Sequence, residues 1–592
     1  MWIRAVFAAL LIGFVQSVGA QGYPTTIAYN ARLTTTSGTP VTGSQTVVFS
    51  LYDVATGGAA LWTESQNVNV VNGELSVALG ETVPIPETTF ARRLFLGIKV
   101  GNDAEMTPRP KLNSVPFAIK ARSPLVRTVY VPHGGDDPAA GAALLAAVAA
   151  VPGSGALTSI HLDAGEYNLG ANSLVLPAAS SLIGLGHSIS NVRSTHPVAT
   201  ITLSAQSVLD NVSVLNIGPG VAAGTDGAAA ILVADGANEA KILHAGARSD
   251  GLGSTANIRN AIKIGAAFNV LVQDSTIFVT GGGSVRGILA NTGTGQGGLR
   301  IENVRIDAFA QAATVQAIGA YILGHQDVQV IDSFMTARGV GGSLTGAIFQ
   351  GAGADVVGGR FVASGAAASS GTRTGIAVIN PVFSRLRGIF INVTGVGTEM
   401  IGMEFTGNST HGANLISASS IEVPTSSAGQ LVGILGRGIA PTLTNTDIFV
   451  TGGATVTKVV GVELIPPATG TGQQSFGGSR NRIEAFHAGS SDAGGGIVST
   501  GPRIVQRFLE VGSTDDGIEG GVSGSGIDPQ VISLRHAIIN SGRSSIRKNQ
   551  GWALSTHFLS VTQTMTLETG GVTTCLATSF GNQFLTNACP TP

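Results

Sequence analysis

Two neighbouring carboxylates in a glycine-rich segment are the first candidates for catalysis. Asp515 and Asp516 are followed directly by glycine, and Arg535 and His536 come in the next apolar segment. Glycoside hydrolysis uses two carboxyl groups held about 5–10 Å apart, one as a general acid and the other as a base or nucleophile. An acidic pair among glycines is also typical of a solvated turn. Both interpretations of these four residues remain open at the level of the sequence.

A second acidic pair, Asp136 and Asp137, precedes an alanine- and leucine-rich stretch at residues 138–151. Such a pair can bind a metal ion or a sugar, but aspartate also caps helices and forms turns. Pro138 is well placed for the first turn of a helix. We therefore expect a helix over residues 138–151 and a turn or capping role for the two aspartates.

Six basic residues in the middle of the chain are candidates for contacts with an acidic sugar: Lys263, Arg286, Arg300, Arg305, Arg338 and Arg360. The sequence holds no Cys-x-x-Cys pair, histidine cluster, phosphate-binding glycine loop or Gly-x-Ser-x-Gly elbow. Aromatic residues make up 5% of the chain, which argues against a long sugar-stacking groove. We predict no cofactor and no metal, and Ca²⁺ would be needed only if the chain were a lyase.

A repeat organises the chain that carries these residues. The segment Leu299–Ile306 has the same apolar pattern as 270–277 and 328–335, and the polar residues Asp274, Asn303 and Asp332 are spaced 29 residues apart. A fixed period of this size indicates a solenoid. Each coil would add one short set of strands to a common apolar column.

Each repeat contains a break in its alternation. Leu299 and Ile301 share one face of a strand, whereas Val304 and Ile306 share a face of the opposite parity. Side chains alternate strictly along a strand, so the chain must turn at Asn303. Asn, Asp and Gly tolerate the left-handed backbone of such a corner. The predicted corner stack is Asn211, Asp274, Asn303, Asp332 and Asn445, with Gly358 and His536 in equivalent places.

A further strand separates the corners. The segments 285–288, 316–318, 345–348 and 374–376 indicate this strand on successive coils. Ile288, Ile318 and Ile348 follow one another at intervals of 30 residues. We align these three isoleucines as neighbours on successive coils. Glycine-rich segments at 466–479 and 512–526 are expected to form loops.

This pattern resembles the right-handed parallel β-helix of the pectin-lyase-like superfamily, in which an Asn or Asp stack occupies one corner. The resemblance covers residues 125–565 and implies an all-β fold. It does not imply one activity, because the fold hosts lyases, hydrolases, esterases and non-enzymatic adhesins. Asp515-Asp516 matches one of four motifs of polygalacturonase-like hydrolases, and Gly165-Glu-Tyr167 matches the opening motif of pectin methylesterases. The other motifs of both families are missing.

The N-terminal part of the chain lies outside the repeat. Residues 1–20 read as a secretory signal peptide, with a basic start, an apolar stretch and small residues before Gln21. Residues 21–122 contain short alternating strands typical of a small antiparallel β-sandwich, and Val71-Asn-Gly-Glu74 predicts a hairpin turn. Segments such as 29–33 and 114–118 resemble an N-terminal module of secreted bacterial proteins, which implies attachment or display.

The C-terminal part, residues 566–592, carries the two cysteines of the chain. Cys575 and Cys589 are expected to form a disulfide in an exported protein, closing a cap on the last coil of a β-helix that spans residues 123–565. Two free thiols are the alternative.

Composition limits the partners. The formal net charge is −2, the isoelectric point is about 6.6 and charged residues are 11% of the chain, so nothing favours nucleic acid or anionic lipid. After signal cleavage no segment is apolar enough to span a membrane. We expect a secreted or cell-surface protein, extracellular or periplasmic, whose partners are polysaccharide or the cell envelope. The oligomeric state is open, since trimers occur among rods of this fold.

The sequence thus favours an adhesin-like structural or binding rod that contacts carbohydrate. The alternative is a polysaccharide lyase or glycoside hydrolase whose carboxylates converge only in the folded chain.

Overall fold

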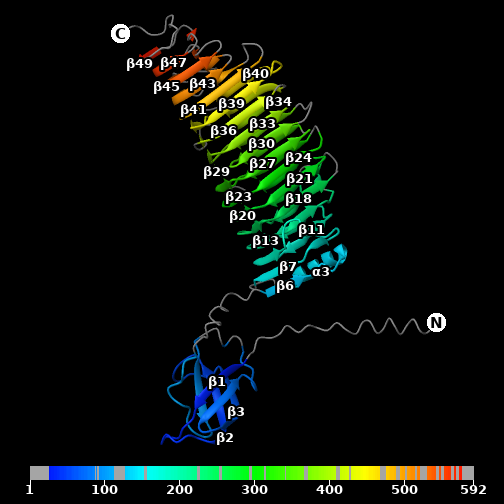
Figure 1. The fold of residues 1–592 in the computed structure, drawn as a ribbon, viewed down its shortest axis with the longest axis vertical. Helices are drawn as coiled ribbons and strands as arrows, with labels where there is room; N and C mark the ends of the chain where they lie inside the picture. The colour runs from blue at the N-terminus through cyan, green and yellow to red at the C-terminus, as the bar shows by residue number, and fades with distance from the viewer. Residues whose placement is uncertain are drawn as a thin grey trace, which may run out of the picture. The chain divides into compact units, whose positions relative to one another are not determined.

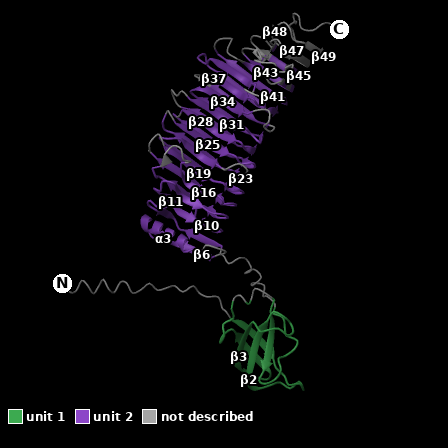
Figure 2. Cartoon of the chain, turned by 180° about the vertical axis from the view of Figure 1, so that it is seen from behind, with its two compact units in different colours: residues 1–123 green, residues 124–592 purple. Residues whose placement is uncertain are grey.

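A computed structural model describes residues 26–576 apart from several short segments, which are residues 87–88, 90–92, 113–126, 152–156, 220, 223–226, 252–256, 292–296, 313–314, 341, 366–370, 408–413, 426–427, 467–474, 489–493, 501–502, 514–515, 521–529, 542–545, 549–551, 562–565 and 568–572. The chain divides into two compact units, residues 1–123 and residues 124–592 (Figure 2). The predicted signal peptide lies outside the described residues.

The first unit is a small antiparallel β domain. Strands β1 (Ile27–Arg32) and β4 (Glu74–Leu79) form one sheet, and β3 (Trp62–Val70), β2 (Gly43–Tyr52) and β5 (Phe95–Val100) form the other. Both sheets contribute to a single core, in which Phe49 and Leu79 are fully buried. This agrees with the predicted sandwich.

The predicted turn at residues 71–74 forms, but its hairpin does not extend beyond it. Asn72 and Gly73 both have positive φ, and the backbone N–H groups of Val71 and Glu74 donate to each other's carbonyl oxygens. Beyond this tight turn β3 pairs with β2, and β4 pairs with β1. The predicted hairpin is thus limited to one antiparallel bridge between Val71 and Glu74, and the turn moves the chain from one sheet to the other.

The second unit is a right-handed parallel β-helix, as predicted (Figure 1). Within the described residues it has one sheet of 28 strands, here called the corner sheet, and one of 16 strands, here called the glycine sheet. The corner sheet has two arms that meet at the polar corner.

Its first arm begins with β6 (Arg127–Val131) and contains β7 (Thr158–Leu162), β10 (Ser180–Ile183), β13 (Val208–Asp210), β17 (Lys241–Leu243), β20 (Val270–Gln273), β23 (Leu299–Glu302), β26 (Val328–Ile331), β29 (Gly353–Val357), β32 (Phe383–Arg387), β35 (Asn414–Ser417) and β38 (Thr442–Thr444). Its second arm contains β8 (Gly165–Asn168), β11 (Ser190–Ser194), β14 (Ser213–Asn216), β18 (Gly246–Gly251), β21 (Thr276–Gly281), β24 (Arg305–Ala310), β27 (Phe334–Gly339), β30 (Arg360–Gly365), β33 (Phe390–Gly395), β36 (Ser420–Thr425) and β39 (Asp447–Gly452). The strands β41 (Ser475–His487), β43 (Arg503–Ser513), β45 (Gln530–Ser541), β47 (Trp552–Val561) and β49 (Thr573–Leu576) complete the sheet, and β41, β43 and β45 pair across both arms.

The glycine sheet contains β9 (Leu174–Leu176), β12 (Ala199–Leu203), β16 (Ala228–Val233), β19 (Asn257–Ile264), β22 (Val285–Asn291), β25 (Gln316–Leu323), β28 (Ser343–Gln350), β31 (Thr372–Ile379), β34 (Gly397–Thr406), β37 (Ala428–Arg437), β40 (Lys458–Ile465), β42 (Gly494–Ser499), β44 (Asp516–Gly520), β46 (Ile546–Lys548) and β48 (Thr566–Leu567). The two-residue strand β15 (Val221–Ala222) pairs antiparallel with β19.

The corner has the left-handed backbone that the break in alternation requires. Residues in the predicted stack have φ between 44° and 55°, namely Asn211, Asp274, Asn303, Asp332 and Asn445. The backbone N–H of Asp274 donates to Glu302 O at 3.0 Å, so this residue bonds to the next coil. The side chain of Asn303 donates to Asp274 Oδ1 at 2.6 Å. His244, Ala418, Arg480 and Phe508 also have positive φ.

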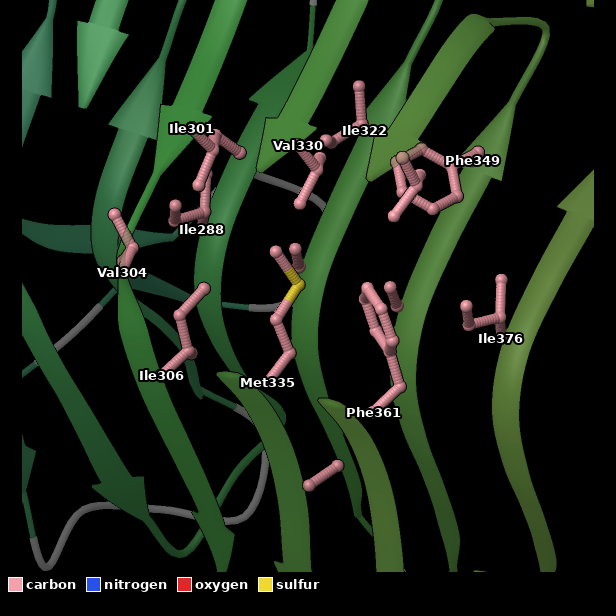
Figure 3. Packing of buried hydrophobic residues seen from close by; sticks show 14 of the residues in the cluster. Ile288, Ile301, Val304, Ile306, Ile322, Val330, Met335, Phe349, Phe361 and Ile376 are labelled. Atoms are coloured by element: carbon pink, nitrogen blue, oxygen red, sulfur yellow. The ribbon is translucent and has the colours of Figure 1, made fainter. Parts of the chain in front are cut away.

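A column of glycines in the glycine sheet lies in close contact with the core and with the next coil. A Cβ on Gly402 would lie 2.3 Å from Ile421 Cγ2 and 2.5 Å from Gly433 O, and Gly433 and Gly461 are in the same situation. The strands of the glycine sheet therefore approach the apolar row of the second arm, where Ile306, Met335 and Phe361 lie side by side (Figure 3).

The register between strands of the glycine sheet differs from the one that the sequence suggested. Ile288 pairs with Ala320, and Ile318 pairs with Arg286 on one side and Thr345 on the other. The alignment of Ile288, Ile318 and Ile348 was therefore wrong. The strands align on their small residues rather than on their isoleucines, because only glycine fits at the closest approach.

Helix α3 (Asp137–Ala149) covers the first coil. Asp136 is its N-cap and accepts a hydrogen bond from Ala139 N at 3.3 Å, while Asp137 Oδ1 lies 2.9 Å from His133 Nε2. Leu144 on its inner face is fully buried in the core of the β-helix. The acidic pair thus lies where a cap would, as the sequence indicated.

The later coils are more regular than expected. Residues 475–479, read as loop, belong to β41, and residues 516–520 form β44 within the glycine sheet. Cys575 lies in β49, and Cys589 lies outside the described residues, so the disulfide stays a prediction. None of the helices in the described part of the chain is long and apolar enough to cross a membrane.

We predict that Gly402→Ala destabilises the β-helix by about 2–3 kcal/mol, because the added methyl group would overlap backbone and core atoms that are already packed. Gly297→Ala is the matched control, since its Cβ would have only ordinary contacts with Asp327, at 3.7 Å or more. Chemical denaturation of the two variants measures the difference. Equal stability of the two would contradict this account of the glycine column.

A second prediction concerns Glu64 in the first unit, which is 1% exposed. Its carboxylate accepts hydrogen bonds from the Thr82 hydroxyl and from the backbone N–H groups of Gly80, Thr82 and Val83. Burial by itself raises the pKa of Glu64, but these hydrogen bonds lower it to about 2. The folded carboxylate therefore stabilises the domain above the ordinary pKa near 4.5, and this contribution is lost as the pH falls from 4.5 towards 2.

Glu64→Gln should cost about 2 kcal/mol at neutral pH, because charge-assisted hydrogen bonds are lost. The variant should also lose less stability than the wild type between neutral pH and pH values below 4.5. Calorimetric melting of both proteins across this range is the measurement, and parallel pH profiles would refute the assignment.

Candidate functional site

Five charged side chains gather on the outer face of the glycine sheet, and we call them the glutamate cluster. They are Glu399 and Glu404 on β34, Arg437 at the end of β37, and Lys458 and Glu463 on β40. Glu404 stands between Met403 and Phe405, which are fully buried in the column, so strand alternation turns the carboxylate outward. Glu404 pairs with Leu435, and Leu435 with Glu463, on successive coils.

One guanidinium holds two of the carboxylates. Arg437 Nη2 lies 3.5 Å from Glu399 Oε1, and Arg437 Nε lies 3.2 Å from Glu404 Oε1. Lys458 Nζ contacts Glu463 in the same way on the next coil. Because Glu399 and Glu404 touch the same planar group, their carboxylates are within the separation of about 5–10 Å that paired acids of glycoside hydrolases have.

Glu399 differs electrostatically from an ordinary surface glutamate. Its partial burial raises its pKa above the ordinary value, and the negative charges of Glu404 and Glu463 raise it further. The positive charges of Arg437 and Lys458 oppose this shift without cancelling it. A carboxyl group that keeps its proton to higher pH than usual is suited to act as a general acid.

The sequence around the cluster explains the burial. Ile401, Val432 and Leu435 form an apolar group on the outer face, and each is at most 1% exposed. They flank the glycine column, with Ile401 and Val432 before the glycine of their strands and Leu435 after it. Charges beside this apolar surface interact more strongly than charges in water.

The residues proposed from the sequence lie elsewhere. Asp515 is outside the described residues, and Asp516 is the first residue of β44, where its backbone pairs with Gly495. Arg535 is exposed on β45, and His536 follows it opposite the left-handed Phe508. The expectation of a turn at Asp516 was wrong, because a strand begins there. The catalytic role of these four residues remains untested.

The six basic residues fall on three different surfaces. Lys263 and Arg286 belong to the glycine sheet, and Arg300 is on β23 of the first arm. Arg305, Arg338 and Arg360 lie on consecutive strands β24, β27 and β30 of the second arm. Among the described residues, no group of three or more His, Cys, Asp or Glu side chains could hold a metal ion.

Sequence reasoning missed the glutamate cluster, although a signal was present. Glu404 and Glu463 both come two residues after a glycine of the column, in Gly402-Met-Glu404 and Gly461-Val-Glu463. This repeat places the two carboxylates on one face, but only after the register of the strands is known.

The fold that carries this cluster is a parallel β-helix, as the strand pairing described above shows. A family model described as a domain of unknown function, DUF8740, matches residues 28–109, which lie in the first unit. No curated protein matches the chain.

Several solved structures are similar to the chain. The catalytic unit of a GH87 alpha-1,3-glucanase from Streptomyces thermodiastaticus has 12% identity, covers 78% of this chain and 92% of its own, and has a TM-score of 0.27. The A-module of the Azotobacter vinelandii mannuronan C-5 epimerase AlgE4 has 16% identity, 68% and 95% coverage and a TM-score of 0.27. A family 28 exopolygalacturonase from Yersinia enterocolitica has 10% identity, 92% and 99% coverage and a TM-score of 0.25. Because these identities and TM-scores are low, the function of the site is argued from this chain's own residues alone.

We predict that Glu399→Gln is neutral or stabilising for the β-helix at alkaline pH. The raised pKa means that folding disfavours the charged carboxylate, so the wild type loses stability as the pH rises through the ordinary value of 4.5 towards the raised value. The amide has no such titration. The difference between variant and wild type should vanish at acid pH and grow on the alkaline side, as melting across pH will show. A variant that is less stable at every pH would mean that Glu399 serves mainly the ion pair with Arg437.

Proposed function

We propose that the β-helix acts on a polysaccharide through the glutamate cluster, with Glu399 as the general acid and Glu404 as the second carboxylate. The observation that carries this proposal is the pair itself. Glu399, whose carboxyl group has a raised pKa, and Glu404 contact the same guanidinium on the outer face of a parallel sheet. Pairs of carboxyl groups in different environments are typical of acid–base sites.

The proposed reaction is hydrolysis of a glycosidic bond. Glu399 gives its proton to the leaving glycosidic oxygen as the bond from that oxygen to the anomeric carbon breaks. A water molecule supplies hydroxide to the anomeric carbon and its remaining proton to Glu404. Arg437 positions both carboxylates. The extended outer face, with Lys263 and Arg286 further along the same sheet, offers contacts for neighbouring sugars.

A carbohydrate-binding rod without catalysis, which the sequence favoured, is the second candidate. The ion pairs of Glu404 with Arg437 and of Glu463 with Lys458 support this candidate. A structural ion-pair network can also shift the pKa of a group beside it, as at Glu399. Against it stands the gathering of five charged side chains at one place on the glycine sheet. Export to the cell surface remains a prediction from residues 1–20.

We predict that Glu399→Gln lowers the hydrolysis of a susceptible polysaccharide by about a hundredfold or more, as expected for loss of a general acid. A panel of neutral and acidic polysaccharides, assayed for new reducing ends and for binding, identifies the substrate. Glu422→Gln is the matched control, because Glu422 also lies on an outer face but contacts Asn392 on the corner sheet.

The pH dependence gives an independent check. Activity of the wild type should fall as the pH rises beyond the raised pKa of Glu399, because the acid is then deprotonated. Binding without any cleavage across the panel would establish the second candidate instead. Cleavage that survives in the Glu399 variant would place the acid elsewhere.

A further inference from the structure

The outer face of the second arm carries an alternation of arginine and phenylalanine on consecutive coils. Arg305 on β24 pairs in register with Phe334 on β27, which pairs with Arg360 on β30, which pairs with Phe390 on β33. We call these four residues the Arg–Phe ladder. The ladder and the glutamate cluster belong to different sheets.

The rings hold the guanidinium groups in place. Arg305 Cζ lies 5.5 Å from the centroid of the Phe334 ring, and Arg360 Cζ lies 5.7 Å from the same ring and 4.9 Å from that of Phe390. An arginine beside an aromatic ring keeps its planar fork of N–H donors free for carboxylate or sulfate oxygens. Both arginines are exposed, whereas both phenylalanines are half-buried.

The two arginines of the ladder differ from their neighbours in lacking a carboxylate. Arg338, on the strand between them, donates from Nε and Nη2 to the two oxygens of Asp307, each at 2.8 Å. Arg248 is paired with Asp250 in a similar way. Within the described part of the chain, neither Arg305 nor Arg360 forms an ion pair, so their positive charges are available to a ligand.

The spacing of the ladder sets a requirement on that ligand. Arg305 and Arg360 are two coils apart, which is roughly 9.5 Å in a parallel sheet. This is close to the length of an extended disaccharide. An acidic group on every second sugar would meet both arginines, and Phe334 between them would contact the uncharged sugar.

The ends of the positive stretch are also defined. On one side the face continues into a groove of about 400 Å³ lined by Glu166, His187, Arg193, Arg248 and Phe278, among others. On the other side the next two strands carry carboxylates, with Glu422 in register with Asn392 and Asp447 in register with Ser420, before Arg482 follows Asp447. An acidic polymer that crosses the strands from coil to coil would therefore extend from the groove to β33 and no further.

We propose that the Arg–Phe ladder binds an extended acidic polysaccharide whose carboxylate or sulfate groups fall on alternate sugars. This binding does not depend on catalysis by the glutamate cluster. It would hold the protein on an acidic glycan whether or not the chain cleaves it.

The test is calorimetric titration of the full chain with hyaluronan fragments, which carry a carboxylate on alternate sugars, at low and at high salt. Arg305→Gln combined with Arg360→Gln should weaken binding by about tenfold or more, because two charge-assisted contacts are lost. Arg300→Gln is the matched control, since Arg300 is exposed on the first arm and already paired with Glu302. Equal melting temperatures of the three proteins exclude a folding defect.

Four further ligands sharpen the outcome. Neutral dextran should not bind, and chondroitin sulfate should bind at least as tightly as hyaluronan if sulfate serves as well as carboxylate. Polygalacturonate, with an acid on every sugar, should not exceed hyaluronan, and tighter binding would overturn the spacing argument. Absence of hyaluronan binding, an unaffected double variant, or equally sensitive binding of a single-stranded oligonucleotide would overturn the proposal.

Discussion

Parallel backbone hydrogen bonding between successive coils is the constraint on which the rest of this β-helix depends. At the corner, the backbone N–H groups of Asp274, Asn303 and Asp332 each donate to a carbonyl oxygen of the following coil. The same pairing fixes the strands on both sides of the corner, from Val270 opposite Leu299 to Ile277 opposite Ile306. A residue can therefore change its backbone conformation only together with its neighbours above and below. This is why the corner recurs at a constant place in successive coils, and why the glycine column does so from Gly287 to Gly461.

The corner could be predicted from the sequence because the break in side-chain alternation is visible in one repeat, without knowing which strand pairs with it. The parity break at Asn303 is visible within one repeat, and side-chain alternation allows no other explanation than a turn. The glycine column was harder, since its register depends on which residue meets Ile421 or Ile306 across the interior. Nor could the sequence reveal Ala418, Arg480 and Phe508 as corner residues, because their types do not favour positive φ. The hydrogen bonds of the neighbouring coils keep them in that conformation.

The candidate site was out of reach for a related reason. Adjacent residues on a strand point to opposite faces, so two neighbouring carboxylates such as Asp515 and Asp516 are a poor way to bring two acids together. In the glutamate cluster, Glu399 and Glu404 come from one strand and are joined through Arg437 on the next coil, whereas Glu463 joins from two coils away, 59 residues after Glu404. Such a cluster is visible only once the coils are in register.

Register also decides what charge means in this protein. A net charge of −2 gave no reason to expect nucleic acid or anionic lipid as a partner. A ligand, however, meets the charges that stack on neighbouring coils, and not the net charge of the whole chain. Where opposite charges meet on neighbouring coils, as in Asp307 with Arg338, they neutralise each other. Where like charges recur on alternate coils with a phenylalanine between them, as in Arg305 and Arg360, no neutralisation occurs. A nearly neutral chain can thus carry a defined cationic strip next to an acidic one, and the overall charge is no guide to which partner each strip would attract.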